Sequence, residues 1–275
     1  MRLSQFVRYS VMAFCISLFM AGAFAQAPAA NGQFQPSVGQ PGKDVVWVPT
    51  PQVLVDKMLD MAKATPQDYV MDLGSGDGRT VITAAKRGIR ALGVEYNPDV
   101  VELSKRNAAA EKVTDRATFV KADLFETDFS QATVITMFLL PDINLKLRRK
   151  ILDLKPGTRI VSNSFRMGDW SADETATISS GCETYCTALL WIVPAKVAGT
   201  WKSAQDEVRI TQEFQMISGT VNSGGRSTPI TNGKMVGDQI TFTAGTSQYT
   251  GRVNGNGIEG TIRTGANSAV WRATR

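Results

Sequence analysis

A short stretch with alternating glycines constrains this sequence most. Residues 72–79 read DLGSGDGR, with an apolar run at 69–71 before them and another at 80–85 after them. This pattern predicts a strand, a tight turn and a helix. Glycine tolerates a positive φ and has no Cβ, so such a turn lets the backbone approach a ligand and lets the helix pack closely on the strand. We therefore expect the functional site at this turn.

The residues around the turn narrow the type of ligand. The next predicted strand, 91–94, ends in Glu95, and a carboxylate there can accept hydrogen bonds from both hydroxyls of a ribose. A phosphate-binding loop would need the pattern G-x-x-x-x-G-K-[ST], but the string has no lysine, and Asp77 would repel a pyrophosphate. The acid-rich loop therefore favours a cationic or neutral nucleoside ligand.

The spacing D-x-G-x-G-x-G, with Glu95 at the end of the next strand, resembles motif I of the class I S-adenosylmethionine (SAM) methyltransferases. The resemblance implies SAM as the cofactor, with its ribose on Glu95 and with Asp72 orienting the loop and the methionine end of the cofactor. The implied cofactor-binding residues in the loop are Asp72, Gly74, Ser75, Gly76 and Gly78.

A second acid follows the predicted strand 117–120. The resemblance assigns Asp123 to the adenine amino group and places Leu124 against the base. The alternative for Asp123 is a helix N-cap or a turn residue.

Strands and helices alternate through residues 45–195. After Glu95 the pattern predicts helices at about 97–111 and 141–154, strands at 117–120, 132–140 and from 159, and a final antiparallel hairpin around 175–178 and 185–193. This order predicts an α/β fold, a doubly wound, Rossmann-like, seven-stranded methyltransferase sheet that binds its ligands at the carboxyl ends of the strands.

The segment ahead of the glycine turn is a candidate substrate entrance. Prolines keep residues 45–51 extended, and Thr50 is expected to cap a helix whose first residue is Pro51. In many class I methyltransferases this segment covers the cofactor, which makes Trp47 and Thr50 entrance candidates. The alternative is that Trp47 packs the helix onto the sheet. Phe138, after the fourth strand, is the third entrance candidate because these enzymes often place the target atom there.

The residues after the fourth strand bear on the methyl acceptor. Amide and adenine N-methyltransferases often carry (N/D)-P-P-(Y/F) at this point, whereas this chain has LLPD at 139–142. Together with GVEYNP at 93–98, KPGTR at 155–159 and MGDW at 167–170, the string 72–79 resembles a bacterial branch related to the protein-lysine methyltransferases that modify mitochondrial ATP synthase and nucleotide carriers. The resemblance implies in-line methyl transfer, with a protein lysine as one acceptor, and another protein group or a small molecule as the alternatives.

The chain contains no histidine, so any chemistry must use other groups, and no metal site is expected. A lysine acceptor must arrive as the neutral amine, and a nearby polar group would help. Asp142, Asn163 and Tyr96 are the catalytic candidates, although Asp142 is equally explained as a helix cap.

The amino terminus resembles an export signal. Residues 1–25 have a basic start, an apolar run and A-F-A before Gln26, which predicts cleavage after Ala25 and an exported, periplasmic or secreted protein. An uncleaved anchor is the alternative, but the apolar run is short for one, so no stable membrane span is expected after cleavage. Residues 26–44 are rich in Pro, Gly, Gln and Ala and predict a flexible leader.

Residues 199–275 differ in pattern from the rest. Short alternating runs separated by Asn-Gly, Gly-Gly and Gly-Asp turns predict a small all-β domain, an antiparallel meander or barrel. Its interior is expected to be filled by side chains, so that it stabilises the protein or mediates protein contacts, with a ligand cavity as the alternative. Cys182 and Cys186 are expected either to pair in an oxidising compartment or to remain free thiols.

The charge argues against a nucleic-acid partner. The net charge of +5 includes Arg2 and Arg8 of the predicted signal, which leaves +3 for the remainder. The enzyme hypothesis has one alternative, an exported nucleoside-binding or scaffold protein that keeps the pocket without turnover.

Overall fold

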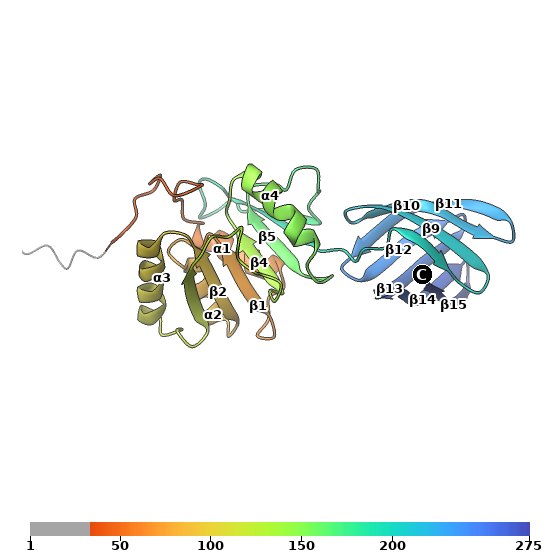
Figure 1. Ribbon diagram of the computed structural model, residues 1–275, viewed down its shortest axis with the longest axis horizontal. Helices are drawn as coiled ribbons and strands as arrows, with labels where there is room; N and C mark the ends of the chain where they lie inside the picture. Colours follow the sequence, from red (N-terminus) through yellow and green to blue (C-terminus); the bar gives the residue numbers. More distant parts are fainter. Residues whose placement is uncertain (1–33) are drawn as a thin grey trace, which may run out of the picture. The chain divides into compact units, whose positions relative to one another are not determined.

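The computed structural model describes residues 34–275, and the predicted signal peptide, 1–25, lies outside this range. The described part contains an α/β sheet and, after it in the chain, a closed β-barrel (Figure 1). Among the described residues, no helix is both long enough and apolar enough to span a bilayer.

The sheet has seven strands in the order β3-β2-β1-β4-β5-β7-β6. The first five strands run parallel, and β7 is antiparallel to both of its neighbours, β5 and β6. The predicted doubly wound sheet with a terminal hairpin is therefore confirmed. Its strands are β1 (Tyr69–Leu73), β2 (Arg90–Glu95), β3 (Ala117–Lys121), β4 (Val134–Met137), β5 (Arg159–Asn163), β6 (Glu174–Thr177) and β7 (Thr187–Ile192).

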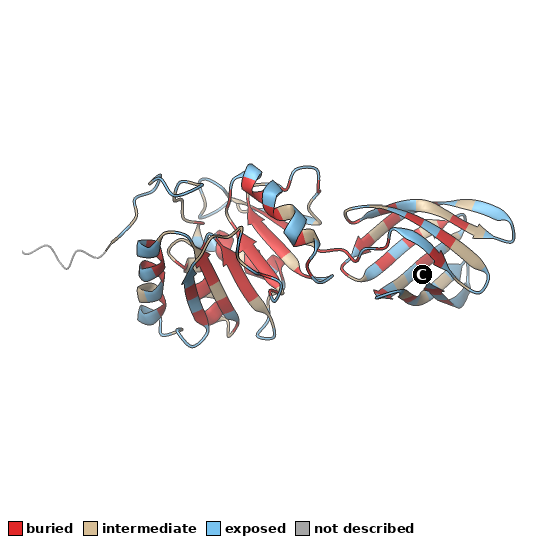
Figure 2. Ribbon diagram, viewed as in Figure 1, coloured by how far each residue is buried: buried red, intermediate tan, exposed pale blue. Residues whose placement is uncertain are grey.

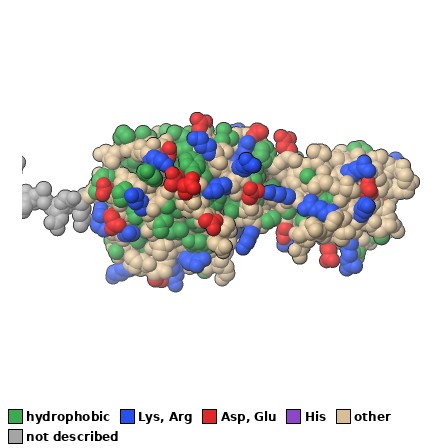
Figure 3. Space-filling view, in the orientation of Figure 1, with side chains coloured by type: hydrophobic (Ala, Val, Ile, Leu, Met, Phe, Trp, Pro, Cys, Tyr) green, Lys and Arg blue, Asp and Glu red, His purple; other side chains and the backbone are tan. Residues whose placement is uncertain are grey.

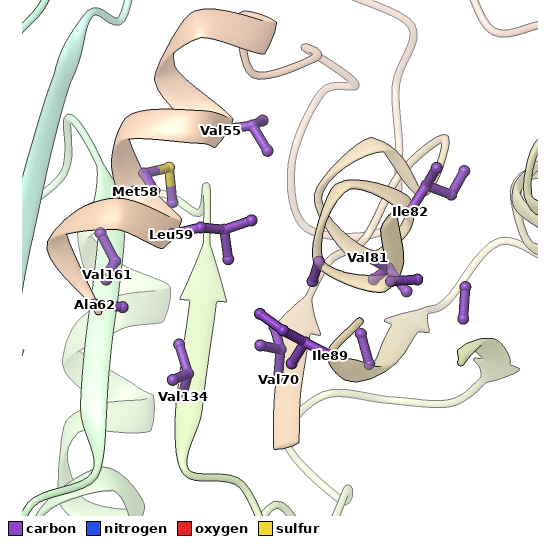
Figure 4. Close-up of a cluster of buried hydrophobic side chains, with 14 of the residues drawn as sticks. Val55, Met58, Leu59, Ala62, Val70, Val81, Ile82, Ile89, Val134 and Val161 are labelled. Carbon is purple, nitrogen blue, oxygen red and sulfur yellow. The ribbon is translucent and has the colours of Figure 1, made fainter. Parts of the chain in front are cut away.

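Helices cover both faces of the sheet because its strands are apolar on both sides (Figure 2). In β1, Val70 packs in one buried cluster with residues of α1 (Gln52–Met61), α2 (Arg79–Lys86) and α3 (Pro98–Ala110). The next residue, Met71, packs on the opposite face with residues of α4 (Pro141–Leu152). Figure 4 shows the first cluster, in which Leu59 and Val81 lie over the strand residues.

The start of α1 differs from the prediction. The helix begins at Gln52, its N-cap position is Pro51, and no side chain caps it. Thr50 accepts a hydrogen bond from the Asn163 side-chain amide instead, with 3.3 Å between Nδ2 and Oγ1. The expected capping role of Thr50 is wrong because its hydroxyl is used to join the chain to the end of β5.

The leader is ordered where the structure describes it. Gly39 N donates to Trp47 O and Trp47 N donates to Gln40 O, at 2.9 and 2.8 Å, which folds the segment back on itself. Farther back, Phe34 O accepts from Arg106 of α3 at 3.1 Å. The expectation of a flexible leader therefore does not hold for residues 34–44, whose backbone groups are paired with specific partners.

The C-terminal strands close into a barrel in the order β10-β11-β12-β13-β14-β15-β8-β9. Its interior holds buried side chains, among them the mutually packed rings of Phe242, Tyr249 and Trp271. This packing agrees with the expectation of a filled interior. The strands are β8 (Gly199–Lys202), β9 (Asp206–Glu213), β10 (Met216–Ser223), β11 (Arg226–Val236), β12 (Gln239–Ala244), β13 (Ser247–Asn254), β14 (Gly257–Thr264) and β15 (Asn267–Thr274).

Leu59→Ala is expected to lower the free energy of unfolding by about 2–5 kcal/mol, because Leu59 is fully buried between α1 and the sheet and its loss leaves a cavity. Val53→Ala on the same helix is the matched control, since Val53 is 40% exposed, and should change stability by less than about 0.5 kcal/mol. Urea unfolding followed by circular dichroism measures both. Equal losses in the two variants would contradict the orientation of α1.

Candidate functional site

A pocket lies at the carboxyl edge of the parallel strands. Loops that follow β1, β2, β3 and β4 line it, and residues 40–50, here called the strap, contribute much of the remaining wall. The expected cofactor and entrance residues that line this pocket are Asp72, Gly74, Ser75, Gly76, Glu95, Asp123, Leu124, Trp47, Thr50 and Phe138.

The glycines of the turn make close packing possible. Gly78 caps the amino end of α2 with φ +84°, and a Cβ there would lie 2.7 Å from the ring of Phe119. Gly76, with φ +52°, has Trp47 Nε1 only 3.1 Å from the position of a Cβ. Gly76 therefore lets the strap approach the turn, whereas Gly78 supports the packing of α2 and lies outside the pocket wall.

Glu95 is held at the pocket by the backbone. Its Oε2 accepts from Gly76 N at 3.1 Å and its Oε1 accepts from Asn97 N at 2.9 Å. These bonds fix the orientation of the carboxylate, and each oxygen keeps a lone pair for another donor. A ligand with two adjacent hydroxyls fits this arrangement.

Asp72 forms the buried end of the site. Its Oδ1 accepts from Thr136 Oγ1 at 2.7 Å, and Thr80 also donates to it. Burial is the main cause that raises the pKa of this carboxyl to about 7, against the opposing effect of the two threonine hydroxyls. Asp72 can therefore bind or release a proton near neutral pH, and a cation in the pocket would favour its ionised form.

Ser75 provides a test of whether the pocket fits a polar ligand. Its Oγ is buried and has no hydrogen-bond partner among the described residues, although Ser75 lines the pocket. A buried hydroxyl without a partner is costly, so a ligand that bonds to it would be favoured. With Glu95 and Asp72, this group suits a polar, cationic nucleoside such as SAM.

Lys43 of the strap contacts the nucleoside end of the pocket. Its Nζ lies 2.5 Å from Asp123 Oδ2 and 4.5 Å from the centre of the Tyr96 ring. The hydrogen bond between Lys43 and Asp123 lowers the pKa of the carboxyl and raises the pKa of the amine. Asp123 also accepts from Phe125 N through Oδ1 at 2.9 Å, so it serves as a turn residue as well as lining the pocket.

The far end of the strap is fixed to the glycine turn. The Thr50 carbonyl oxygen accepts from Arg79 Nη1 at 2.9 Å, and Arg79 also pairs with Asp77 at 2.6 Å. Trp47 lies half-buried in the pocket wall, so it occupies the predicted entrance position. The strap is thus attached at both ends, through Lys43 and through Thr50.

The structure does not bring the three catalytic candidates together. Tyr96 lines the pocket beside Lys43, at the nucleoside end. Asn163 is fully buried at the end of β5, and Asp142 is exposed in the first turn of α4 and is not part of the pocket wall. The catalytic roles of these residues remain predictions.

Several functional contacts were missed from the sequence. Lys43 lies in a Pro- and Gly-rich segment with no periodicity, and Thr136 lies within an apolar strand. The only signal for Thr136 is a polar residue in a buried strand, since such a group needs a hydrogen-bond partner. Nothing in the sequence pattern points Lys43 toward Asp123, which lies 80 positions away.

The stability of the ligand-free protein should depend on Asp72. A folded-state pKa of about 7, above the value of about 3.9 in an unfolded chain, means that the folded protein binds this proton more tightly. Its stabilising effect is present below about pH 4 and is lost as the pH rises to about 7. Relative to Asp72→Asn, the wild type should therefore lose up to about 4 kcal/mol over this window. Urea unfolding at a series of pH values measures this, and parallel pH profiles would contradict it.

Comparisons with known proteins agree with this geometry. The family model for the ANTKMT methyltransferase domain matches residues 72–174. A protein-lysine N-methyltransferase from Saccharolobus islandicus is 43% identical over 152 residues, which cover 54% of this chain and 94% of that protein. A human lysine N-methyltransferase, named for an ATP synthase component, is 34% identical over 171 residues, or 62% of this chain and 69% of that protein.

A solved structure shows the same similarity. An RNA methyltransferase from Salinibacter ruber, crystallised with S-adenosyl-L-homocysteine, is 43% identical and superposes with a TM-score of 0.51 over 55% of this chain and 96% of its own. The pocket, its acids and these relatives identify SAM as the cofactor and favour an enzyme over a binding protein without turnover. The chain belongs to the class I SAM-dependent methyltransferases, in the family of the ANTKMT methyltransferase domain.

Proposed function

We propose that this enzyme methylates a lysine side chain of a protein. The observation that supports this most is the 43% identity to a protein-lysine N-methyltransferase that the chain covers almost completely. The human relative, whose name specifies a lysine N-methyltransferase of ATP synthase, supports the same class of acceptor.

The chain's own residues have distinct tasks in this reaction. Glu95 and Asp123 hold the nucleoside, and Asp72 and Ser75 face the other polar groups of the cofactor. When bound, SAM supplies a methyl group on a sulfonium, which the acceptor displaces in line. Because the reaction needs the neutral amine, the apolar wall of Phe138 and Leu139 helps by disfavouring the ammonium form. Positioning of this kind is worth about 7–11 kcal/mol in well-oriented reactions.

RNA is the second candidate acceptor because the Salinibacter ruber relative is named an RNA methyltransferase. An RNA site would need a concentration of basic side chains. In the view of Figure 3, Lys and Arg side chains are interspersed with Asp and Glu. This mixture supports a protein acceptor.

We further propose that the protein is exported after cleavage behind Ala25. The signal-like residues 1–25 support export, and so does the disulfide between Cys182 and Cys186, since such bonds persist in oxidising compartments. Mass spectrometry of the protein from a fractionated native host should find a chain that starts at Gln26 in the periplasm or medium. A chain that retains residues 1–25 in the cytoplasm would contradict export.

Glu95→Ala should weaken SAM binding by about 10- to 100-fold, because it removes an acceptor of charge-assisted hydrogen bonds worth about 1.5–3 kcal/mol. Methyl transfer at limiting SAM should fall in parallel. Glu102→Ala on α3 is the matched control, since Glu102 is exposed and pairs only with Lys105 among the described residues. Calorimetric titration measures the affinity, and unchanged binding in Glu95→Ala would overturn the role of Glu95.

The acceptor class can be tested with labelled SAM. Protein extract of the native host should incorporate methyl groups, and an identical extract whose lysines were first blocked by reductive dimethylation should not. Purified RNA from the same cells is the second arm. Label in RNA but not in protein would overturn the lysine proposal, as would label in protein that survives lysine blocking.

A further inference from the structure

Three aromatic side chains from separate loops meet beside the pocket. The ring centres of Phe138 and Tyr185 lie 5.1 Å apart, those of Phe165 and Tyr185 5.8 Å, and those of Phe138 and Phe165 5.9 Å. Phe138 follows β4, Phe165 follows β5, and Tyr185 precedes β7. Because β7 runs antiparallel to β5, all three loops reach the same edge of the sheet.

This aromatic cluster extends the pocket away from the nucleoside end. Phe138 lines the pocket, and its ring connects the pocket wall to Phe165 and Tyr185. Glu95 and Asp123 come from the loops after β2 and β3, on the other side of β1. The cluster therefore lies on the side of the pocket where an acceptor can approach without passing the nucleoside.

The outermost ring, Tyr185, is held in place by its loop. Its side chain is 43% exposed, and its φ of +56° is unusual for a residue other than glycine. Cys182 and Cys186 form a disulfide that closes the loop around Tyr185. Ser164, directly before Phe165, also has a positive φ, +58°, and donates from its backbone N to Thr187 O at 2.7 Å. Such conformations persist only where the surroundings enforce them, and they concentrate at ligand sites.

We infer that Phe138, Phe165 and Tyr185 form the binding wall for the acceptor lysine, and that the Cys182–Cys186 disulfide sets its affinity by holding Tyr185. This inference rests on the proposed lysine methylation. Aromatic faces suit this side chain because they pack against its four methylene groups and attract its ammonium group as it arrives. The wall then leads the nitrogen toward Phe138, into the pocket.

A binding measurement tests the wall without relying on turnover. The probe is Nα-acetyl-lysine methylamide, titrated by saturation-transfer NMR against the full chain saturated with S-adenosylhomocysteine. The norleucine analogue has nearly the same shape without the charge, and it should bind more weakly. Tyr185→Ala should raise the dissociation constant of the lysine probe by about 3- to 30-fold, with no change in S-adenosylhomocysteine affinity.

Two matched variants separate the ring from the loop. Tyr185→Phe keeps the ring and should bind the probe like the wild type, as should Thr184→Ala, whose exposed side chain lies next to Tyr185 in the same loop. Cys182→Ser combined with Cys186→Ser should weaken the probe by at least about threefold. Dithiothreitol should do the same to the wild type and leave the double variant unchanged.

The outcomes distinguish this inference from the proposed function. Equal probe affinity in the wild type and Tyr185→Ala overturns the wall, as does failure of the wild type to bind the probe. A parallel loss of S-adenosylhomocysteine affinity in Tyr185→Ala also overturns it, because the residue would then act on the cofactor site. Lysine methylation by the wild type, measured separately, decides the proposed function whichever result the probe gives.

Discussion

The buried carboxyl of Asp72 joins the parts on which the site depends. It belongs to β1, accepts a hydrogen bond from Thr136 of β4 and another from Thr80 of α2, and lines the pocket. Three elements are therefore fixed around one group that burial makes costly to ionise. The glycine turn starts two residues after Asp72, so its position relative to β4 is set by the same bonds. A cation bound in the pocket would offset the cost of the charge, which links cofactor binding to the packing of the sheet.

The strap adds a second level of organisation. Its amino-terminal part contacts the nucleoside acid Asp123 through Lys43, and its carboxyl-terminal part is bonded to Arg79 and Asn163 through Thr50. Gly76 permits the approach of Trp47, where a larger residue would collide with the indole. Residues that carry no regular secondary structure thus complete a pocket whose floor the parallel strands provide. Such a wall excludes water from the reacting groups more effectively than open loops would.

The sequence predicted those features that arise from local patterns and missed those that arise from distant contacts. The glycine turn, the alternating strands and the helix start at Asn97 follow from neighbouring residues, and the structure confirms them. Strand β11 was missed because Pro229 and the Asn232–Gly233 pair resemble a turn, whereas the structure places a register shift there with Asn232 at φ +52°. The contacts of Lys43, Thr50 and Tyr185 join segments far apart in the chain, and no local pattern encodes them.

The topology of the sheet separates the two substrates. Strand order reverses at β1, with β2 and β3 on one side and β4, β5 and β7 on the other, and ligands of such sheets bind at this point. The nucleoside acids come from the first side and the aromatic cluster from the second. The disulfide lies in the loop before β7, so it supports only the aromatic side. Because the two sides share only the glycine turn and β4 at the centre, a change in the disulfide can alter acceptor binding while the cofactor residues keep their hydrogen bonds.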